Sequence, residues 1–315
     1  MVNVGDRILT RGSIGLTSAS VFAGSDITSR MRGNGTKSAI PNVGDQIYTR
    51  GIYGHKSGST SSIFTTWLYQ DTVTGYDTRF NLIDTTSGYE IPGYGICTDG
   101  VYFYLCQSTA VLKILMRDMS IADQYNCSAP TAICVNGDYL YISNGTAVFK
   151  VDKDTMSLVT SANIADSWYS ICSEGDYLYL SKNGGYPWTN GHISKYLCSD
   201  LSLVASTSGG IVFYPRAVGT DGTYIYTVGG KLNNADYVND NLFKFLVSDM
   251  SYVGQTAFDI GAAYNMAVKS GKLYVGGYFR HQFYIIKASD LSLLEQYNQG
   301  DGGLTYQSVG ICILP

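Results

Sequence analysis

The chain is short of charge, of histidine motifs and of long hydrophobic runs, and each shortage excludes a class of protein. No run approaches the ~18 apolar residues of a membrane-spanning helix. The first residues lack the basic and apolar regions of a secretion signal, so none is expected. Charged residues make up 15% of the sequence and the net charge is -4, which argues against a nucleic-acid-binding protein.

Signatures of common catalytic sites are also missing from the sequence. The three histidines, His55, His192 and His281, form no HxH or HExxH pair. No nucleophile elbow, phosphate loop or dinucleotide fingerprint is present, and the Gly-Gly pairs read as loop glycines. We therefore predict no catalytic residue, no metal site and no cofactor, and a protein that is not an enzyme.

What the chain has in excess is tyrosine and glycine. It contains 27 tyrosines and 36 glycines but only 6 prolines. Aromatic residues favour pleated sheets and glycine serves tight turns, so this composition indicates a turn-rich all-β protein.

One pattern recurs along the chain with a period near 40 residues. An apolar strand ends in a turn of the Asx-Gly type, and a strand rich in tyrosine follows. A sixth, truncated copy begins at Gly310. The five full copies begin at Ile96, Ile133, Ile171, Val218 and Ala267.

Each unit continues with a third strand that carries a lysine, a turn containing Asp and Ser, and a short fourth strand. The lysines are interpreted as structural, either reaching outward to solvent or pairing with the nearby turn aspartate. They are Lys113, Lys150, Lys195, Lys244 and Lys287.

Four antiparallel strands per unit, repeated around a ring, are typical of a β-propeller. Residues 62–315 resemble the β-propeller repeat superfamily, which implies an all-β propeller. A count of the expected inner strands predicts six blades, with inner strands at Ile96, Ile133, Ile171, Val218, Ala267 and Ile311. Residues 308–315 are expected to supply the missing inner strand of the first blade and so close the ring. Because residues 40–48 loosely resemble the repeat, a seven-bladed propeller remains an alternative.

Residues 1–61 are predicted to form an N-terminal β-arm that serves assembly. Val4–Gly12 recurs as Val43–Gly51 in a duplicated VGDxIxTRG element. Residues 1–60 contain seven basic and three acidic residues, so their net charge is +4. The net charge of the remaining residues is therefore -8. Such asymmetry suggests either a basic arm that docks on an acidic neighbour or a solvated polar tail. The arm arginines are Arg7, Arg11, Arg30, Arg32 and Arg50.

The seven cysteines are interpreted as apolar packing rather than as chemistry. Cys97, Cys134, Cys172 and Cys312 share one position of the innermost strand, which suggests a ring of thiols. Neighbouring inner strands are too far apart for thiolate ligation at about 2.3 Å, or for disulfides. We expect these four to be buried, reduced and free of metal.

The most suggestive candidates for binding are aromatic residues in loops. In a propeller, the loops between the second and third strands and those between blades emerge on one face. Tyrosine, tryptophan and arginine commonly anchor interfaces, and aromatic rings stack on sugars. The segment 233–241 also offers oxygen ligands for calcium, although a solvated loop explains it as well. The candidate loop-face residues are Trp168, Tyr169, Tyr186, Trp188, Asn190, Tyr214, Arg216, Asp236, Tyr237, Asp240, Tyr264, Tyr278, Arg280 and Tyr306.

By architecture, the chain resembles bacteriophage tail, fibre or decoration proteins. This resemblance implies a non-catalytic structural protein of the virion, located outside the cell when mature. Its expected partners are other virion proteins or copies of itself, bound through residues 1–61, and a host surface glycan or receptor, with no nucleic acid and no membrane. The alternative is a glycan-binding lectin or a polysaccharide-active propeller enzyme.

Overall fold

The computed structural model describes fourteen stretches of the chain and divides it into two compact units. Met1–Ser59 and Thr60–Pro315 are the two units. In the first, β1 (Tyr48–Thr49) and β2 (Ile52–Tyr53) form a short antiparallel hairpin. The described residues are 48–49, 52–53, 63–67, 70–76, 82–87, 95–116, 120–164, 168–182, 191–207, 210–233, 236–261, 263–277, 282–297 and 308–313.

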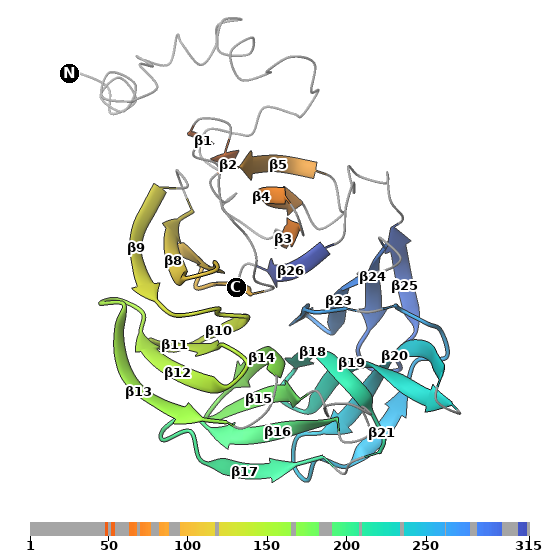
Figure 1. Cartoon of the computed structure of the whole chain (residues 1–315). Helices are drawn as coiled ribbons and strands as arrows, with labels where there is room; N and C mark the ends of the chain where they lie inside the picture. The colour runs from red at the N-terminus through yellow and green to blue at the C-terminus, as the bar shows by residue number, and fades with distance from the viewer. Residues whose placement is uncertain are drawn as a thin grey trace, which may run out of the picture. The chain divides into compact units, whose positions relative to one another are not determined.

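Every regular element in these stretches is a β-strand, and five four-stranded antiparallel sheets are each built from consecutive strands (Figure 1). The first three sheets run from β6 to β17. Their strands are β6 (Ile96–Thr98), β7 (Tyr102–Cys106), β8 (Ala110–Leu115), β9 (Ser120–Asn126), β10 (Ala132–Asn136), β11 (Tyr139–Ser143), β12 (Ala147–Asp152), β13 (Ser157–Asn163), β14 (Trp168–Glu174), β15 (Tyr177–Lys182), β16 (His192–Leu197) and β17 (Leu203–Ser206).

The fourth and fifth sheets run from β18 to β25. The described residues contain no helix that is long and apolar enough to cross a membrane. The strands are β18 (Phe213–Thr220), β19 (Tyr224–Asn233), β20 (Asp236–Leu246), β21 (Tyr252–Gln255), β22 (Met266–Lys269), β23 (Lys272–Gly277), β24 (Gln282–Lys287) and β25 (Leu293–Tyr297).

A further four-stranded sheet joins distant parts of the second unit. β26 (Ser308–Ile313) pairs with β3 (Ile63–Trp67), which is followed by β4 (Gln70–Tyr76) and β5 (Leu82–Ser87). β26 contacts β6 on one side and both β22 and β23 on the other. We call this the composite sheet.

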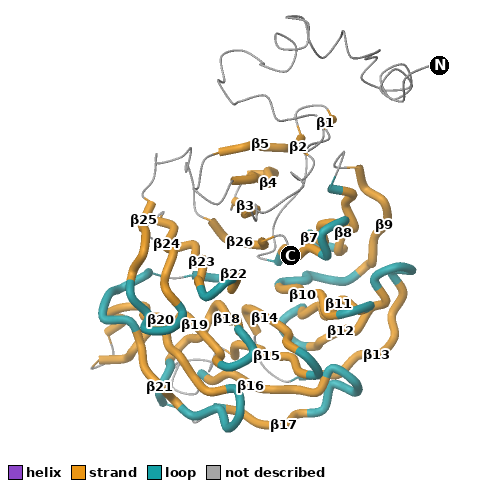
Figure 2. Tube along the Cα trace, turned by 180° about the vertical axis from the view of Figure 1, so that it is seen from behind, coloured by secondary structure: helices purple, strands orange, loops and turns teal. Residues whose placement is uncertain are grey.

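The predicted β-propeller is confirmed. The first strands of successive sheets contact one another in the order β6, β10, β14, β18, β22. Figure 2 shows β10, β14, β18 and β22 of this series from behind. Five blades consist of consecutive strands, so a count of six depends on whether the composite sheet acts as a blade. The seven-bladed alternative is wrong, because β26 contacts β6 directly and the described part of residues 1–61 forms only the β1–β2 hairpin.

Tyrosines of the second strands form much of the packing between blades. Tyr104, Tyr141, Tyr179 and Tyr226 are at most 2% exposed. Strand alternation puts each of them on the same face as the tyrosine two residues earlier, and the intervening Phe103, Leu140, Leu178 or Ile225 is equally buried on the opposite face. Both faces of these strands are therefore core, which explains their almost continuous apolar sequence.

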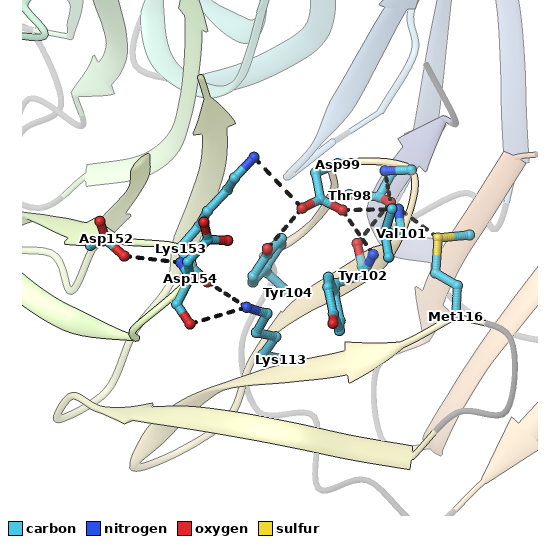
Figure 3. A network of polar contacts seen from close by, with 11 residues as sticks. Thr98, Asp99, Val101, Tyr102, Tyr104, Lys113, Met116, Asp152, Lys153 and Asp154 are labelled. Atoms are coloured by element: carbon cyan, nitrogen blue, oxygen red, sulfur yellow. Dashed lines mark hydrogen bonds and ion pairs between the residues drawn. The ribbon is translucent and has the colours of Figure 1, made fainter. Parts of the chain in front are cut away.

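The repeated lysines link neighbouring blades. Lys113 Nζ donates hydrogen bonds to the carbonyl oxygens of Lys153 (2.7 Å) and Asp154 (3.4 Å), which lie in the turn of the next blade (Figure 3). Its ammonium also lies 4.5 Å from the centre of the Tyr102 ring of its own blade. The expectation that the lysines reach solvent or pair with a turn aspartate is therefore wrong for Lys113.

The same link recurs at the next three lysines. Lys150 donates to the carbonyl oxygens of Cys198 and Ser199, Lys195 to that of Val247, and Lys244 to those of Ala288 and Ser289. Each ammonium lies 3.8–4.2 Å from the ring centre of the tyrosine that begins the second strand of its blade. We call Lys113, Lys150, Lys195 and Lys244 the linking lysines.

Lys287 does not belong to this set. Each linking lysine pairs in register with the second tyrosine of the second strand of its blade, for example Lys150 with Tyr141, whereas Lys287 pairs with Lys272. Lys287 is exposed and forms an ion pair with Asp290 at 3.1 Å, as the sequence analysis predicted for this position. Ile285 takes the place of the linking lysine and packs with Tyr274, Phe283 and Ile311 of β26. The contact with the composite sheet is therefore apolar.

Candidate functional site

A wide bulge at the start of β18 brings together candidate residues of the loop face. Phe213 pairs with Gly230, but Ala217 pairs with Val228, so Tyr214, Pro215 and Arg216 interrupt the regular ladder. Tyr214 has φ of 62°, a left-handed conformation that is costly for a residue with a side chain. Bulges re-aim side chains and are common beside functional sites.

Arg216 occupies the centre of this arrangement. Its Nη1 donates to Asp240 Oδ2 at 2.7 Å, and the two side chains are only 11% and 14% exposed. The guanidinium carbon lies 5.2 Å from the centre of the Tyr214 ring and 5.7 Å from that of Tyr264. We call Tyr214, Arg216, Asp240 and Tyr264 the loop-end cluster.

Asp240 is the electrostatically perturbed member of the cluster. Burial raises its pKa above the usual value, and the nearby Asp259 acts in the same direction, while the Arg216 guanidinium opposes both. The Asp240 backbone is fixed as well, since its N–H donates to Asp259 Oδ1 and its carbonyl oxygen accepts from the Ile260 N–H. The cluster is thus a rigid, mutually neutralised group.

Two supporting residues were not predicted from the sequence. Ser181 Oγ of the preceding blade donates to the Arg216 carbonyl oxygen at 2.8 Å. Asp259 also accepts from the Gly261 N–H, an Asx turn that the Asp-Ile-Gly sequence could have suggested. Neither residue belongs to an aromatic loop, which is where the sequence analysis concentrated.

Gly191 shows where the predicted loop of Tyr186, Trp188 and Asn190 returns to the propeller. A Cβ at Gly191 would lie 2.6 Å from Pro215 Cδ and 2.9 Å from the Tyr214 backbone nitrogen. Only glycine permits this approach, so the end of that loop packs directly against the loop-end cluster.

Of the fourteen loop-face candidates, the structure brings four together as the loop-end cluster. The backbones of Trp168, Tyr169, Asp236 and Tyr237 lie in strands β14 and β20. The other candidates, and the five arm arginines, lie outside the described residues: Tyr186, Trp188, Asn190, Tyr278, Arg280 and Tyr306, with Arg7, Arg11, Arg30, Arg32 and Arg50.

One of the predicted calcium ligands in segment 233–241, Asp240, is paired with an arginine in the structure. Asp240 Oδ2 accepts a hydrogen bond from Arg216 Nη1 and forms an ion pair with it, so this carboxylate already has a cationic partner. Within the described residues, no group of three or more His, Cys, Asp and Glu side chains is placed to hold a metal ion.

Four cysteines line a cavity of about 260 Å³ among β26 and the first strands of the five blades. Cys97, Cys134 and Cys312 are buried as predicted, and Cys172 is half-buried. All seven cysteines are free. Burial raises the pKa of the Cys134 thiol to about 12, and it raises those of Cys97 and Cys172 well above their ordinary value. These groups are therefore neutral thiols, which are poor nucleophiles.

Comparison with known proteins supports the fold class alone. No family model and no curated protein sequence matches the chain. Its structure is similar to hydrazine synthase from Kuenenia stuttgartiensis, with a TM-score of 0.61 and 16% identity over 78% of this chain and 84% of that one. It is also similar to a chain of a nidogen/laminin complex, with a TM-score of 0.59 and 10% identity over 82% of this chain and 99% of that one. A protein of unknown function from Bacteroides caccae is similar too, with a TM-score of 0.60 and 11% identity over 81% of this chain and 99% of that one. The chain is a β-propeller, and identities this low show nothing about its activity.

Proposed function

We propose that this protein is a non-catalytic structural and interaction protein that presents the loop end of its propeller to a partner. The observation that carries the proposal is the loop-end cluster, where Arg216 forms an ion pair with Asp240 and its guanidinium lies near the rings of Tyr214 and Tyr264. Tyrosine and arginine are enriched among the residues that dominate binding energy at interfaces. Side chains that are already held in place lose little entropy on binding.

The setting that we propose is a bacteriophage virion, as part of a tail, a fibre or a capsid decoration. Residues 1–61 would join the protein to other virion proteins or to further copies, and the loop end would face a host glycan or receptor. The opposite charges of the two parts, +4 on residues 1–60 and -8 on the remainder, support an arm that docks on an acidic surface.

We also propose that the composite sheet is the sixth blade of a closed ring. Support comes from the contacts of β26 with β6 on one side and with β22 and β23 on the other. Ile311 is 3% exposed and packs against Tyr274, Phe283 and Ile285 of the β22–β25 blade. Closure in this way removes the open strand edges that invite aggregation.

The second candidate is a glycan-binding or polysaccharide-active propeller. It is favoured by the partly exposed rings of Tyr214 and Tyr264 in the loop-end cluster, because flat aromatic surfaces stack on sugars.

One experiment separates these functions. The full chain is incubated with a panel of bacterial surface polysaccharides, whose chain length is followed by size-exclusion chromatography, and its own mass is followed by mass photometry. We expect a defined multi-copy assembly and no shortening of any polysaccharide. Shortening would show an enzyme and overturn the proposal, and a lasting monomer that is retained on a polysaccharide would establish the lectin instead.

A further inference from the structure

A cavity of about 560 Å³ lies at the junction between the β18–β21 and β22–β25 blades. Its wall includes the acidic residue Asp221, the aromatic residues Tyr224 and Tyr226, and the aliphatic residues Ala288 and Leu294. Asp221 lies in the β18–β19 hairpin and Ala288 in the β24–β25 turn, whereas the loop-end cluster lies toward the other end of β19 and β20. The cavity and the loop-end cluster are therefore at opposite ends of the blade.

The repeated blades allow this cavity to be compared with the equivalent place at another junction. Lys153, at the junction of the β6–β9 and β10–β13 blades, stands at the position of Ala288. The carbonyl oxygen of each accepts a hydrogen bond from the linking lysine of the preceding blade, from Lys113 at 2.7 Å and from Lys244 at 2.8 Å. The N–H of each donates to a carbonyl oxygen in the first hairpin of its own blade. The two residues therefore occupy the same place in their blades.

The acidic residues of the two junctions are equivalent as well. Asp99 Oδ2 accepts a hydrogen bond from the Tyr104 hydroxyl at 2.9 Å, and Asp221 Oδ2 accepts one from the Tyr226 hydroxyl at 2.8 Å. The Oδ1 atom of each aspartate accepts from the N–H groups two and three residues later. Both carboxylates are therefore held in the same orientation by their own hairpin.

The two junctions differ in what reaches the carboxylate. Lys153 Nζ lies 3.9 Å from Asp99 Oδ2 and forms an ion pair with it (Figure 3), and the Asp99 side chain is 14% exposed. Ala288 ends at its Cβ and cannot reach Asp221, which is exposed. The cavity borders both Ala288 and Asp221, so it lies in the place that the side chain of Lys153 takes at the other junction.

The remaining junctions with a linking lysine fill this place with side chains of their own. Cys198 and Val247 stand at the position of Ala288, since their carbonyl oxygens accept from the linking lysines of the preceding blades. Both side chains are larger than that of alanine. Ala288 is thus the smallest residue at this position, which explains why a cavity forms here.

Two lysines on the cavity wall are directed away from the carboxylate. Lys272 and Lys287 pair with each other across β23 and β24. Strand alternation puts their side chains on the same face as Tyr274 and Ile285, which pack against β26 of the composite sheet. Their ammonium groups therefore lie on the face turned away from the β18–β21 blade and from Asp221.

A third lysine, Lys244, does lie near Asp221 and interacts with it electrostatically. Its ammonium is held by two backbone carbonyl oxygens of the next blade. Lys113 is held in the same way at the other junction, where the ion pair between Asp99 and Lys153 forms beside it. A linking lysine is therefore compatible with a second ammonium group at the carboxylate.

We propose that this cavity binds a linear alkylammonium group, with its charge at the Asp221 carboxylate and its methylenes against the aromatic and aliphatic wall. Lys153 shows the same arrangement within the molecule, where a lysine side chain reaches Asp99. Chains of this kind bury their methylenes along apolar surface and keep the charged end at a polar partner. A free amine and a lysine side chain of a partner protein both carry this group. The inference goes beyond the proposed function, because the cavity lies at the end of the blade opposite the loop-end cluster.

Ligand-observed NMR on the full chain tests the site. The saturation-transfer signal of cadaverine, a linear diamine, is titrated against the protein. Pentanediol keeps the carbon chain without the charge, and tetramethylammonium keeps the charge without the chain. We expect saturable binding of cadaverine alone. Equal binding of tetramethylammonium would show only a diffuse counter-ion on an acidic protein and would overturn the proposal, as would the absence of cadaverine binding.

Matched variants locate the binding in the cavity. Asp221→Asn should weaken cadaverine binding about fivefold, which is the contribution of a partly exposed ion pair. Ala288→Lys should abolish binding, because it supplies the ammonium from within the chain as Lys153 does. Asp200→Asn removes an exposed turn carboxylate of another blade and should leave binding within about twofold.

Circular dichroism melts verify that each variant folds, and Asp221→Asn decides the question if Ala288→Lys does not fold. Unchanged binding in Asp221→Asn would overturn the proposal. A lysine with both backbone ends capped then distinguishes the two sources. Tighter binding of the capped lysine than of cadaverine would assign the site to a lysine of a partner protein, and the reverse would assign it to a free amine. Either result supports the proposal and is independent of what the loop end binds.

Discussion

The linking lysines show how a repeated charge can be buried between blades. Lys113, Lys150, Lys195 and Lys244 are 5–9% exposed, yet each ammonium meets carbonyl oxygens of the next blade and a tyrosine ring of its own. Hydrogen bonds to carbonyl dipoles and the negative face of a ring offset part of the cost of desolvating an ammonium. Each linking lysine therefore holds its own blade and the next blade at a fixed distance from each other.

Replacing Lys150 by methionine tests this role with little change in side-chain volume. The variant loses the bonds to the Cys198 and Ser199 carbonyl oxygens and the contact with Tyr139, so we expect the free energy of unfolding to fall by about 2 kcal/mol. Urea denaturation measures the change. The matched control is Lys287→Met, which removes only an exposed ion pair and should unfold like the wild type. Equal effects of the two changes would contradict the linking role.

The cysteines of the cavity should resist alkylation until the protein unfolds. Because burial raises the pKa of Cys134 to about 12, its reactive thiolate is scarce below that pH. At pH 8 we expect iodoacetamide to label Cys134 and Cys97 at least about a hundredfold more slowly than in urea-unfolded protein, as followed by mass spectrometry. Rapid labelling of the folded protein would show that these thiols are accessible and ionised.

At the scale of elements, the sequence predicted the strands and hairpins well because they are encoded locally. Alternation and turn residues located the strands of the five consecutive blades. The alignment of the last blade failed because Gly137 is the first residue of its hairpin loop, whereas Gly271 is the second. If the repeats are aligned on these glycines, the one-residue difference between the hairpin loops is overlooked. Lys287 then appears equivalent to the linking lysines, although Ile285 occupies their position in the sheet.

The loop-end cluster could be predicted only in part, for a related reason. Tyr214, Arg216, Asp240 and Tyr264 were recognised as loop-face candidates by residue type. Their meeting depends on the β18 bulge and on the close approach of Gly191, and both arise from packing between blades. Local sequence pattern carries no information on such long-range contacts, so neither the ion pair nor the partners of the linking lysines could be deduced.

Deleting residues 308–315 tests the composite sheet as an element. The truncation removes β26, exposes an edge of β3 and uncovers the apolar patch around Tyr274 and Phe283. We expect a loss of several kcal/mol in unfolding free energy, or aggregation, because one or two kcal/mol is already a large fraction of a domain's stability. Calorimetry and light scattering measure both. A truncated protein that melts like the intact chain would refute closure by β26.

At the scale of the whole molecule, the chain combines a propeller with a separate N-terminal unit, and we propose a different task for each. Assembly is assigned to residues 1–61, while contact with a host or a glycan is assigned to the loop end. The two surfaces use different residues, so changes at one should leave the other intact.

Removing residues 1–60 tests this division. Since the second compact unit begins at Thr60, the remaining propeller should stay folded and monomeric but fail to assemble, as seen by circular dichroism and mass photometry. Trp188→Ala, in the loop that returns at Gly191, is the counterpart and should assemble normally. Normal assembly without the arm, or failure of the armless chain to fold, would contradict the division.

The composite sheet also has a consequence for the order of events during synthesis. Each blade from β6 to β25 consists of consecutive strands and can form soon after it leaves the ribosome. Among the strands of the second unit, β3, β4 and β5 are made before the five blades and their partner β26 after them, so their sheet cannot be complete until β26 has been made. Contacts between distant parts of a chain are slow to form. The edge of β3 is thus the longest-lived open edge of the nascent second unit, and synthesis of β26 is the step that allows it to be covered.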